Sequence, residues 1–168
     1  MNGDGATGPV PAAAAAVHLL VARGESVATV ESLTGGLLSA AFVEIAGVSA
    51  VFRGGLVVYA TDLKESLAGV PGALLAERGP VDPDVAVALA EGGRSRCGAD
   101  WAVSTTGVAG PEPQGGQPVG AVYVAVAGPA SSVVRRLDLD GGRAAIRAAA
   151  VRGALDLLTA RLRAAPPA

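Results

Sequence analysis

Apolar residues along the chain form runs that alternate between helical and extended patterns. Gly24 ends the first helical run, and Asp82 followed by Pro83 marks the start of a later helix, because aspartate caps free N–H groups and proline suits the first helical position. The run at 54–59 has no polar alternation, which predicts a strand covered on both faces of its sheet. The predicted helices cover residues 12–23, 37–45, 61–67, 71–78, 83–97 and 143–162, and the predicted strands cover residues 26–30, 54–59, 99–106, 120–127 and 131–139.

Helices that interleave with apolar strands predict an α/β fold, a single three-layer α/β/α domain with a mixed sheet. The last two strands are expected to form an antiparallel pair across Gly128 and Pro129. We assign residues 1–11 to a flexible N-terminal tail and residues 12–163 to the domain. The tail is rich in Gly and Pro and has no basic region, so it does not resemble a signal peptide, and a cytoplasmic location is expected.

Composition narrows the function classes further. The 168 residues are 51% hydrophobic and carry 13 Lys+Arg against 15 Asp+Glu, which gives no electrostatic basis for binding nucleic acid or an anionic membrane. The longest apolar run, 12–22, is far shorter than the ~20 residues of a membrane span. With a single cysteine, Cys97, and a single histidine, His18, a disulfide framework, a zinc cage or a Ser-His-Asp triad is not expected. We therefore expect no metal and no cofactor.

Twelve of the basic residues are arginine and one, Lys64, is lysine. Arginine stays charged at any working pH, whereas the lysine amine loses its proton readily on burial. A lone lysine is therefore either a chance survivor of a biased composition or a residue at a position where arginine cannot serve. Composition alone leaves both interpretations open.

Two glycine-rich segments follow predicted strands. In the segment 31–36, Ser32 and Thr34 precede Gly35 and Gly36 at the start of a helix, where a serine nucleophile can be held and backbone N–H groups can meet an anion. The alternative is that Ser32 or Thr34 only caps the helix. In the segment 104–111, Thr106, Gly107 and Gly110 follow an apolar strand and can supply oxyanion or phosphate contacts.

Two further candidates complete the set. Tyr59 ends a strand and Lys64 lies early in the next helix, so both are expected over the same sheet edge as Ser32; the alternatives are an ordinary strand-end aromatic and a solvated lysine. Arg143 and Arg147 share one helix face and can clamp a phosphate, although a solvated face, or neutralisation by nearby aspartates, is the alternative. The loop at 112–117 is a candidate lid, or is merely exposed.

These segments, in this order, resemble the CinA C-terminal domain family, the nicotinamide-nucleotide amidohydrolases. The resemblance runs from about residue 12 to residue 162, and the chain resembles the stand-alone form of the family. It rests on the segments Glu31-Ser32-Leu33-Thr34-Gly35-Gly36, Gly55 through Tyr59 to Lys64, Thr106-Gly107-Val108-Ala109-Gly110-Pro111, Pro118-Val119-Gly120, and Gly142-Arg143 with Arg147.

The resemblance implies hydrolysis of the carboxamide of nicotinamide mononucleotide to nicotinate mononucleotide and ammonia, without a metal, by a self-associated protein. It implies that Ser32 is the nucleophile, Lys64 the base and Tyr59 an assistant in proton transfer. Substrate contacts are expected from the helix start at Thr34, Gly35 and Gly36, from the strand end at Thr106, Gly107 and Gly110, and from Arg143 and Arg147 at the phosphate. The loop after Gly110 is about one residue shorter than usual and has Gln117 where lysine is common. A non-catalytic nucleotide-binding or interaction module linked to competence or DNA-damage responses is the alternative function.

Overall fold

The computed structural model of the protein describes residues 9–166. This part of the chain contains six α-helices, five strands and one short 3₁₀ helix, η1 (Val48–Ala50). The elements follow one another as α1 (Pro9–Arg23), β1 (Val27–Glu31), α2 (Leu37–Val43), η1, β2 (Phe52–Val57), α3 (Thr61–Ser66), α4 (Gly72–Arg78), α5 (Pro83–Cys97), β3 (Trp101–Gly107), β4 (Ala121–Ala127), β5 (Ser132–Asp138) and α6 (Arg143–Ala164).

The strands form one mixed sheet in the order β2-β1-β3-β4-β5. β1 is parallel to both of its neighbours, β2 and β3, whereas β4 and β5 continue the sheet in antiparallel pairs. The chain crosses from β1 to β2 on one side and returns past β1 to β3 on the other. The carboxyl ends of β1, β2 and β3 therefore meet at one edge, at the switch point where ligands bind in open α/β sheets.

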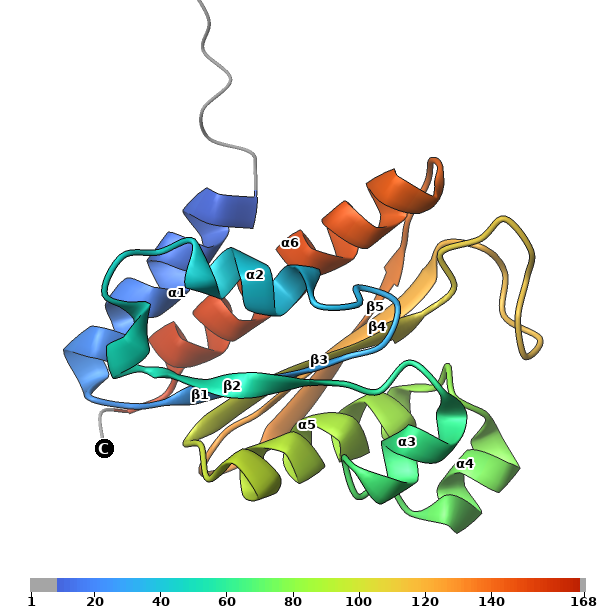
Figure 1. Ribbon diagram of the computed structural model, residues 1–168, viewed down its shortest axis with the longest axis horizontal. Helices are drawn as coiled ribbons and strands as arrows, with labels where there is room; N and C mark the ends of the chain where they lie inside the picture. Colours follow the sequence, from blue (N-terminus) through green and yellow to red (C-terminus); the bar gives the residue numbers. More distant parts are fainter. Residues whose placement is uncertain (1–8, 167–168) are drawn as a thin grey trace, which may run out of the picture.

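Helices cover both faces of the sheet and give three layers (Figure 1). α1, α2 and α6 lie on one face, and α3, α4 and α5 on the other. The largest core cluster lies under the first group, where Leu20, Phe42 and Leu155 are fully buried. A second and a third cluster lie under α5, around Val30 and around Tyr123. The predicted three-layer α/β/α domain with a mixed sheet is confirmed.

The residues that the sequence predicts to end or begin helices do so in the structure at two boundaries. Gly24 follows the end of α1 with φ of 63°. The Asp82 side chain accepts the N–H of Asp84 at 2.8 Å and caps α5, with Pro83 at the first helical position. Residues 9–11, which the sequence assigned to the tail, belong to α1, and the rest of the predicted tail lies outside the described residues.

The prediction for β2 is wrong in one respect. β2 runs from Phe52 to Val57, two residues earlier than expected, and it is an edge strand paired with β1 alone. Its residues alternate in burial, and Val57 is 45% exposed. The absence of polar side chains arises from Gly54 and Gly55, not from cover on both faces. β1, β3 and β4 are the strands whose residues are buried throughout, apart from partial exposure at Gly107.

Two negative findings concern the described residues only. Within residues 9–166, no helix is both long and apolar enough to cross a membrane. In the same part of the chain, no three His, Cys, Asp or Glu side chains come together as a group able to hold a metal ion.

Candidate active site

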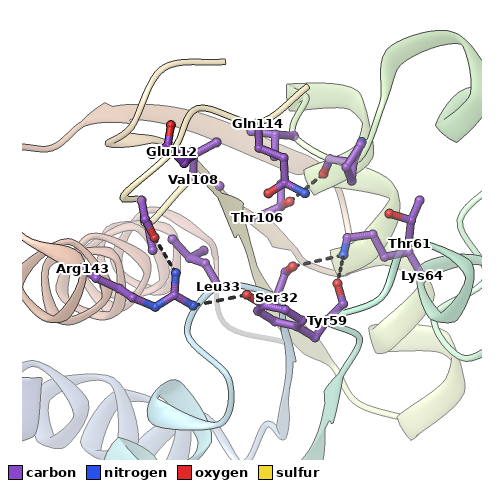
Figure 2. A pocket seen from close by; sticks show the side chains of 15 residues that line it. Ser32, Leu33, Tyr59, Thr61, Lys64, Thr106, Val108, Glu112, Gln114 and Arg143 are labelled. Carbon is purple, nitrogen blue, oxygen red and sulfur yellow. Dashed lines mark hydrogen bonds between the residues drawn. The ribbon is translucent and has the colours of Figure 1, made fainter. Parts of the chain in front are cut away.

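Three strand ends bring the predicted catalytic residues together. Ser32 directly follows β1. Tyr59 lies between β2 and α3, and Lys64 lies within α3. Thr106 is the second-last residue of β3. Ser32, Tyr59, Lys64 and Thr106 line one pocket (Figure 2). The pocket lies at the switch point of the sheet, as the parallel order of β2, β1 and β3 requires.

Lys64 and Ser32 are in direct contact. The Nζ atom of Lys64 lies 3.0 Å from Ser32 Oγ, and Nζ donates to the carbonyl oxygens of Val58 at 2.7 Å and Tyr59 at 3.3 Å (Figure 2). Three oxygens thus surround the amine, which donates to all three in its charged form. When the amine loses one proton, the two carbonyls can keep the two remaining N–H groups, and the lone pair then faces the Ser32 hydroxyl.

Burial favours this neutral amine. The Lys64 side chain is 1% exposed, although it lies on the short helix α3. Within the described residues, no carboxylate lies within salt-bridge distance of its Nζ. Desolvation therefore lowers the pKa of Lys64 to about 8, from an ordinary value of 10.5. About a tenth of the molecules then carry the base form of this amine at pH 7, and about half of them at pH 8.

Tyr59 and Arg143 meet at the mouth of the pocket. Arg143, the first residue of α6, donates one Nη to the Tyr59 hydroxyl at 3.2 Å and the other to the Gly110 carbonyl at 2.7 Å (Figure 2). The Tyr59 hydroxyl has no hydrogen bond to Ser32 or Lys64 among the described residues; it is the backbone carbonyl of Tyr59 that contacts the lysine. Arg143 therefore ties the β2 side of the pocket to the loop after β3.

The opposite wall comes from the end of β3. Thr106 is buried and its hydroxyl donates to the Pro80 carbonyl at 2.6 Å, which fixes the segment before α5 against the strand. Gly107 packs against β4, where an added Cβ would lie 2.8 Å from the Ala121 carbonyl. Only glycine therefore allows the strand end and β4 to approach this closely.

Not every predicted binding residue lines the pocket. The residues that line it are Ser32, Leu33, Tyr59, Thr61, Lys64, Pro80, Val81, Thr106, Gly107, Val108, Ala109, Gly110, Glu112, Gln114 and Arg143. Glu112 and Gln114 place the candidate lid loop at the pocket. Four predicted substrate-binding residues, Thr34, Gly35, Gly36 and Arg147, lie outside this lining.

The helix-cap alternative for Ser32 and Thr34 is wrong. Gly36 is the N-cap of α2, with φ of 100° and no side-chain cap. The Thr34 hydroxyl donates instead to the Glu31 carboxylate at 2.7 Å, and Ser32 faces Lys64. The carboxylate of Glu31 takes the capping role, because it accepts the N–H groups of Leu38 and Ser39.

Arg147 contacts the backbone of the serine turn. Its Nε donates to the Leu33 carbonyl at 2.9 Å and an Nη donates to the Thr34 carbonyl at 3.0 Å. Neither Arg143 nor Arg147 forms an ion pair within the described residues, since Asp138 pairs with Arg136. The neutralisation by aspartate that the sequence left open is therefore not observed.

Sequence reasoning gave no role to several residues of the site. Glu31 was quoted as part of a motif without a function, although a charged residue at the end of an apolar strand is a usable signal. Pro80 and Val81 enter the pocket through the connection before α5, and no pattern in the sequence indicates that. Thr61 follows Tyr59 within the same motif and was overlooked for want of a distinctive spacing.

The fold and site define an open α/β domain with a buried lysine amine against a strand-end serine. The model of the CinA C-terminal domain matches residues 10–162, nearly all of the chain. A CinA-like protein of Frankia casuarinae is 48% identical over 148 residues, which are 88% of this chain and 34% of that protein. A CinA-like protein of Geobacter sulfurreducens is 46% identical over 151 residues, which are 88% of this chain and 36% of that protein. The chain belongs to the CinA C-terminal domain family, and it spans about a third of the length of these curated relatives.

Solved structures agree with this assignment. The competence/damage inducible protein CihA from Agrobacterium tumefaciens matches with a TM-score of 0.87 and 37% identity, covering 92% of this chain and 95% of that one. The competence damage-inducible protein A from Klebsiella pneumoniae matches with a TM-score of 0.92 and 30% identity, covering 95% of this chain and all of that one. Both chains are of domain size, like the one described in this structure.

Proposed function

We propose that the protein hydrolyses the carboxamide of nicotinamide mononucleotide to nicotinate mononucleotide and ammonia, with Ser32 as nucleophile and Lys64 as base. The observation that carries the proposal is the contact between Lys64 Nζ and Ser32 Oγ at 3.0 Å, with the carbonyls of Val58 and Tyr59 as the other two neighbours of the amine. A buried amine that faces a serine hydroxyl with its lone pair matches the requirement for general-base activation of a nucleophile.

In the first half of the reaction, Ser32 Oγ bonds to the amide carbon while its proton passes to Lys64 Nζ. The carbonyl oxygen takes the displaced electron pair and becomes an oxyanion. As the oxyanion collapses, the C–N bond breaks and the proton on Lys64 goes to the departing nitrogen. Ammonia leaves, the ester of Ser32 remains, and Lys64 is neutral again.

Water completes the cycle. The neutral amine of Lys64 takes a proton from a water molecule as the water oxygen bonds to the ester carbon. The second oxyanion collapses, the bond to Ser32 Oγ breaks, and the lysine returns its proton to the serine. The product is released as a carboxylic acid, which gives its proton to solvent and becomes a carboxylate. Ser32 and Lys64 relay the protons of both bond-breaking steps, so the proposed cycle uses neither metal nor cofactor.

The oxyanion has a backbone donor close at hand. The N–H of Leu33, the residue after the nucleophile, donates to no acceptor among the described residues, and Leu33 lines the pocket. Donors fixed in place before reaction stabilise a developing oxyanion strongly. We assign further contacts to the strand end at Thr106, Gly107 and Gly110, which forms the facing wall.

Tyr59 and Arg143 hold the nucleotide end of the substrate in this proposal. The Tyr59 hydroxyl accepts from Arg143, so its own O–H is free to donate to a bound substrate or to the departing nitrogen. Arg143 donates to a neutral carbonyl and a neutral hydroxyl, and a phosphate is a stronger acceptor than either. We therefore assign Arg143 to the phosphate, and Thr34, Gly35 and Gly36 to the turn that carries the nucleophile.

Self-association is part of the proposal through the family resemblance, and a cytoplasmic location is proposed alongside it. A non-catalytic binding module remains the second candidate, because the solved relatives carry names that refer to competence and damage induction. A buried lysine in contact with a serine supports the enzyme over that module.

Incubation of the protein with nicotinamide mononucleotide, followed by measurement of released ammonia, tests the proposal. Wild type is expected to turn over, and Ser32→Ala is expected to lose activity to the background. Ser26→Ala, a serine at the far end of β1, serves as the matched control and should retain activity. Absence of turnover in wild type, or full turnover in Ser32→Ala, would contradict it.

A further inference from the structure

The turn that carries the nucleophile lies between two opposite charges. It joins β1 to α2 over residues 32–36. On one side lies the guanidinium of Arg147, which reaches the turn from the second helical turn of α6. On the other side lies the carboxylate of Glu31, the residue immediately before Ser32. Neither group lines the pocket, so neither is placed to touch a substrate there.

Arg147 holds the carbonyl side of the turn. Its Nε and one Nη donate to the carbonyls of Leu33 and Thr34, at 2.9 and 3.0 Å. The carbonyl of Ser32 accepts the N–H of Gly35 at 3.1 Å. The carbonyls of Ser32, Leu33 and Thr34 are therefore all engaged within the protein, and rotating the Leu33–Thr34 peptide would break a charge-assisted hydrogen bond.

Glu31 holds the turn from within the core. Its side chain is 0% exposed, and within the described residues no basic side chain lies within 4.0 Å of it. One carboxylate oxygen accepts the Thr34 hydroxyl and the Leu38 N–H, both at 2.7 Å. The other accepts the N–H and hydroxyl of Ser39 at 3.1 and 2.8 Å. Four donors thus engage the carboxylate, two on each oxygen, and all of them come from the turn and the start of α2.

The hydrogen bonds of Arg147 and Glu31 to the turn act together as a brace, and Leu33 shows its effect. Its carbonyl is fixed by Arg147, while its N–H has no acceptor among residues 9–166. A free N–H on the residue after the nucleophile is the donor that serine hydrolases with a strand-to-helix turn use for the oxyanion. The brace thus fixes the serine hydroxyl toward Lys64 and keeps a backbone donor available beside it.

We propose that Arg147 and Glu31 are positioning residues that together hold the serine turn in its reactive conformation, and that Arg147 acts on the rate of the chemical step and not on capture of the phosphate. The inference rests on the proposed function for its turnover readout. It assigns to Arg147 a role different from the phosphate clamp that the sequence suggested. Arg143, four residues earlier on the same helix, keeps the phosphate role.

The test compares Arg147→Met with Arg143→Met in the whole chain, with nicotinamide mononucleotide as substrate. Arg147→Met is expected to lower kcat roughly 10²-fold with KM within about twofold, the loss typical of a disturbed oxyanion donor. Arg143→Met is expected to raise KM about tenfold or more. A raised KM with unchanged kcat in Arg147→Met would overturn the inference and restore the phosphate clamp.

Arg147→Lys keeps the charge but reaches one carbonyl at a time, so its kcat should fall between wild type and Arg147→Met. This variant carries the test if Arg147→Met does not fold. Glu31→Gln replaces one carboxylate oxygen by an amide NH₂, which donates hydrogen bonds and cannot accept the N–H of Ser39 or Leu38. It should lower kcat with little change in KM, and an unchanged kcat in folded Glu31→Gln would overturn the role of Glu31.

A second readout separates this inference from the proposed substrate. A fluorophosphonate probe phosphonylates activated serines without any need for a nucleotide: the serine oxygen bonds to phosphorus, fluoride leaves, and the hydroxyl proton passes to the base. Its rate of labelling at Ser32 reports the conformation of the turn. Labelling should slow in Arg147→Met and stay unchanged in Arg163→Met, a change at an exposed arginine near the end of the same helix. If wild type leaves the nucleotide intact yet shows this labelling pattern, the proposed function fails and the positioning role stands. Equal labelling of wild type and Arg147→Met, or a wild type that resists the probe, overturns the positioning role.

Discussion

The amine of Lys64 lies 3.0 Å from the hydroxyl of Ser32, although the two residues come from different layers of the domain. Ser32 sits on the turn that leads into α2, and Lys64 belongs to α3 on the opposite face of the sheet. The pair meets because β1 and β2 are parallel neighbours whose carboxyl ends lie at one edge. Four predictions follow from this pair and its surroundings.

Replacement of Lys64 by arginine is expected to abolish hydrolysis. Arginine keeps its proton at any working pH and has no lone pair to accept the serine proton. Lys64→Arg should therefore lower kcat by 10² to 10⁴-fold, the contribution typical of a general base. The measurement is ammonia release under saturating substrate.

The same variant separates the two function classes. A nucleotide-binding module should tolerate arginine, so calorimetric binding of nicotinamide mononucleotide is measured beside turnover. Arg78→Lys, a change at a half-exposed arginine of α4, is the matched control and should leave both quantities unchanged. Turnover by Lys64→Arg comparable to wild type would contradict a base role for this lysine.

The pH dependence of kcat/KM should follow the ionisation of Lys64. Desolvation lowers the pKa of this amine to about 8, and its base form is the active one. The rate is therefore expected to rise with pH and level off above about pH 8, with a tenfold loss per unit on the acid side. Measurements between pH 7 and 9 avoid the second ionisation of the substrate phosphate near pH 6. A rate that falls across this interval would contradict the assignment.

Stability should also depend on pH through Lys64. The unfolded chain holds the proton up to about pH 10.5, whereas the folded protein releases it at about pH 8. The unfolded state thus binds more protons between these values, and the free energy of unfolding rises with pH across that window. The gain attributable to Lys64 is about 3 kcal/mol at most.

Urea unfolding of wild type and of Lys64→Met at a series of pH values isolates this contribution, because the other ionisable groups are shared. The free energy of unfolding of wild type minus that of Lys64→Met should increase between pH 8 and 10.5. Below pH 8 this difference should stay level. A difference that is constant throughout would show that the folded state leaves the lysine pKa unperturbed.

Gly55→Ala is expected to disturb the site from outside it. A Cβ at Gly55 would collide with the hydroxyls of Thr29 and Ser39, which hydrogen-bond each other at 2.7 Å. Ser39 also donates to Glu31, so the added methyl should displace a partner of the buried carboxylate. We expect a loss of about 1–3 kcal/mol in the free energy of unfolding and a several-fold decrease in kcat.

Denaturant unfolding and turnover measure these two effects. Gly142→Ala is the control for stability, because a Cβ at Gly142 meets no atom within 4 Å. It should lower the free energy of unfolding by no more than about 1 kcal/mol, because Gly142 is the N-cap of α6 and alanine is a poorer N-cap than glycine. If Gly55→Ala is as stable and as active as wild type, a disturbance of the packing between β2 and α2 does not change the conformation of the serine turn.

The sequence predicted the parts of the site that depend on strand order. Apolar runs with short glycine-rich ends place Ser32, Lys64 and Thr106 at strand ends, and parallel strands bring such ends together. The predicted positions are confirmed, because they need only the period of the pattern and the side of the sheet on which strands end. The role of Lys64 as base stays a prediction.

The contacts that the sequence could not predict involve backbone acceptors. Arg147 binds two carbonyls of a turn 113 and 114 residues away, and carbonyls are present at every position, so no residue type reveals the pairing. The same holds for Arg143 and the carbonyl of Gly110. The exposure of β2 was missed for a different reason, since Gly54 and Gly55 remove polar side chains without implying burial.

The alternation of side chains along a strand gives the sheet the function of a partition. Glu31 faces the layer of α2 and α6, where the brace lies, and Ser32 meets the lysine of the layer beyond. The support for the serine turn thus lies on one face of the sheet and the proposed base on the other. A designer who seeks another amide substrate can therefore vary the loop at 112–117 while keeping Lys64 and the contacts of Arg147 and Glu31 to the turn unchanged.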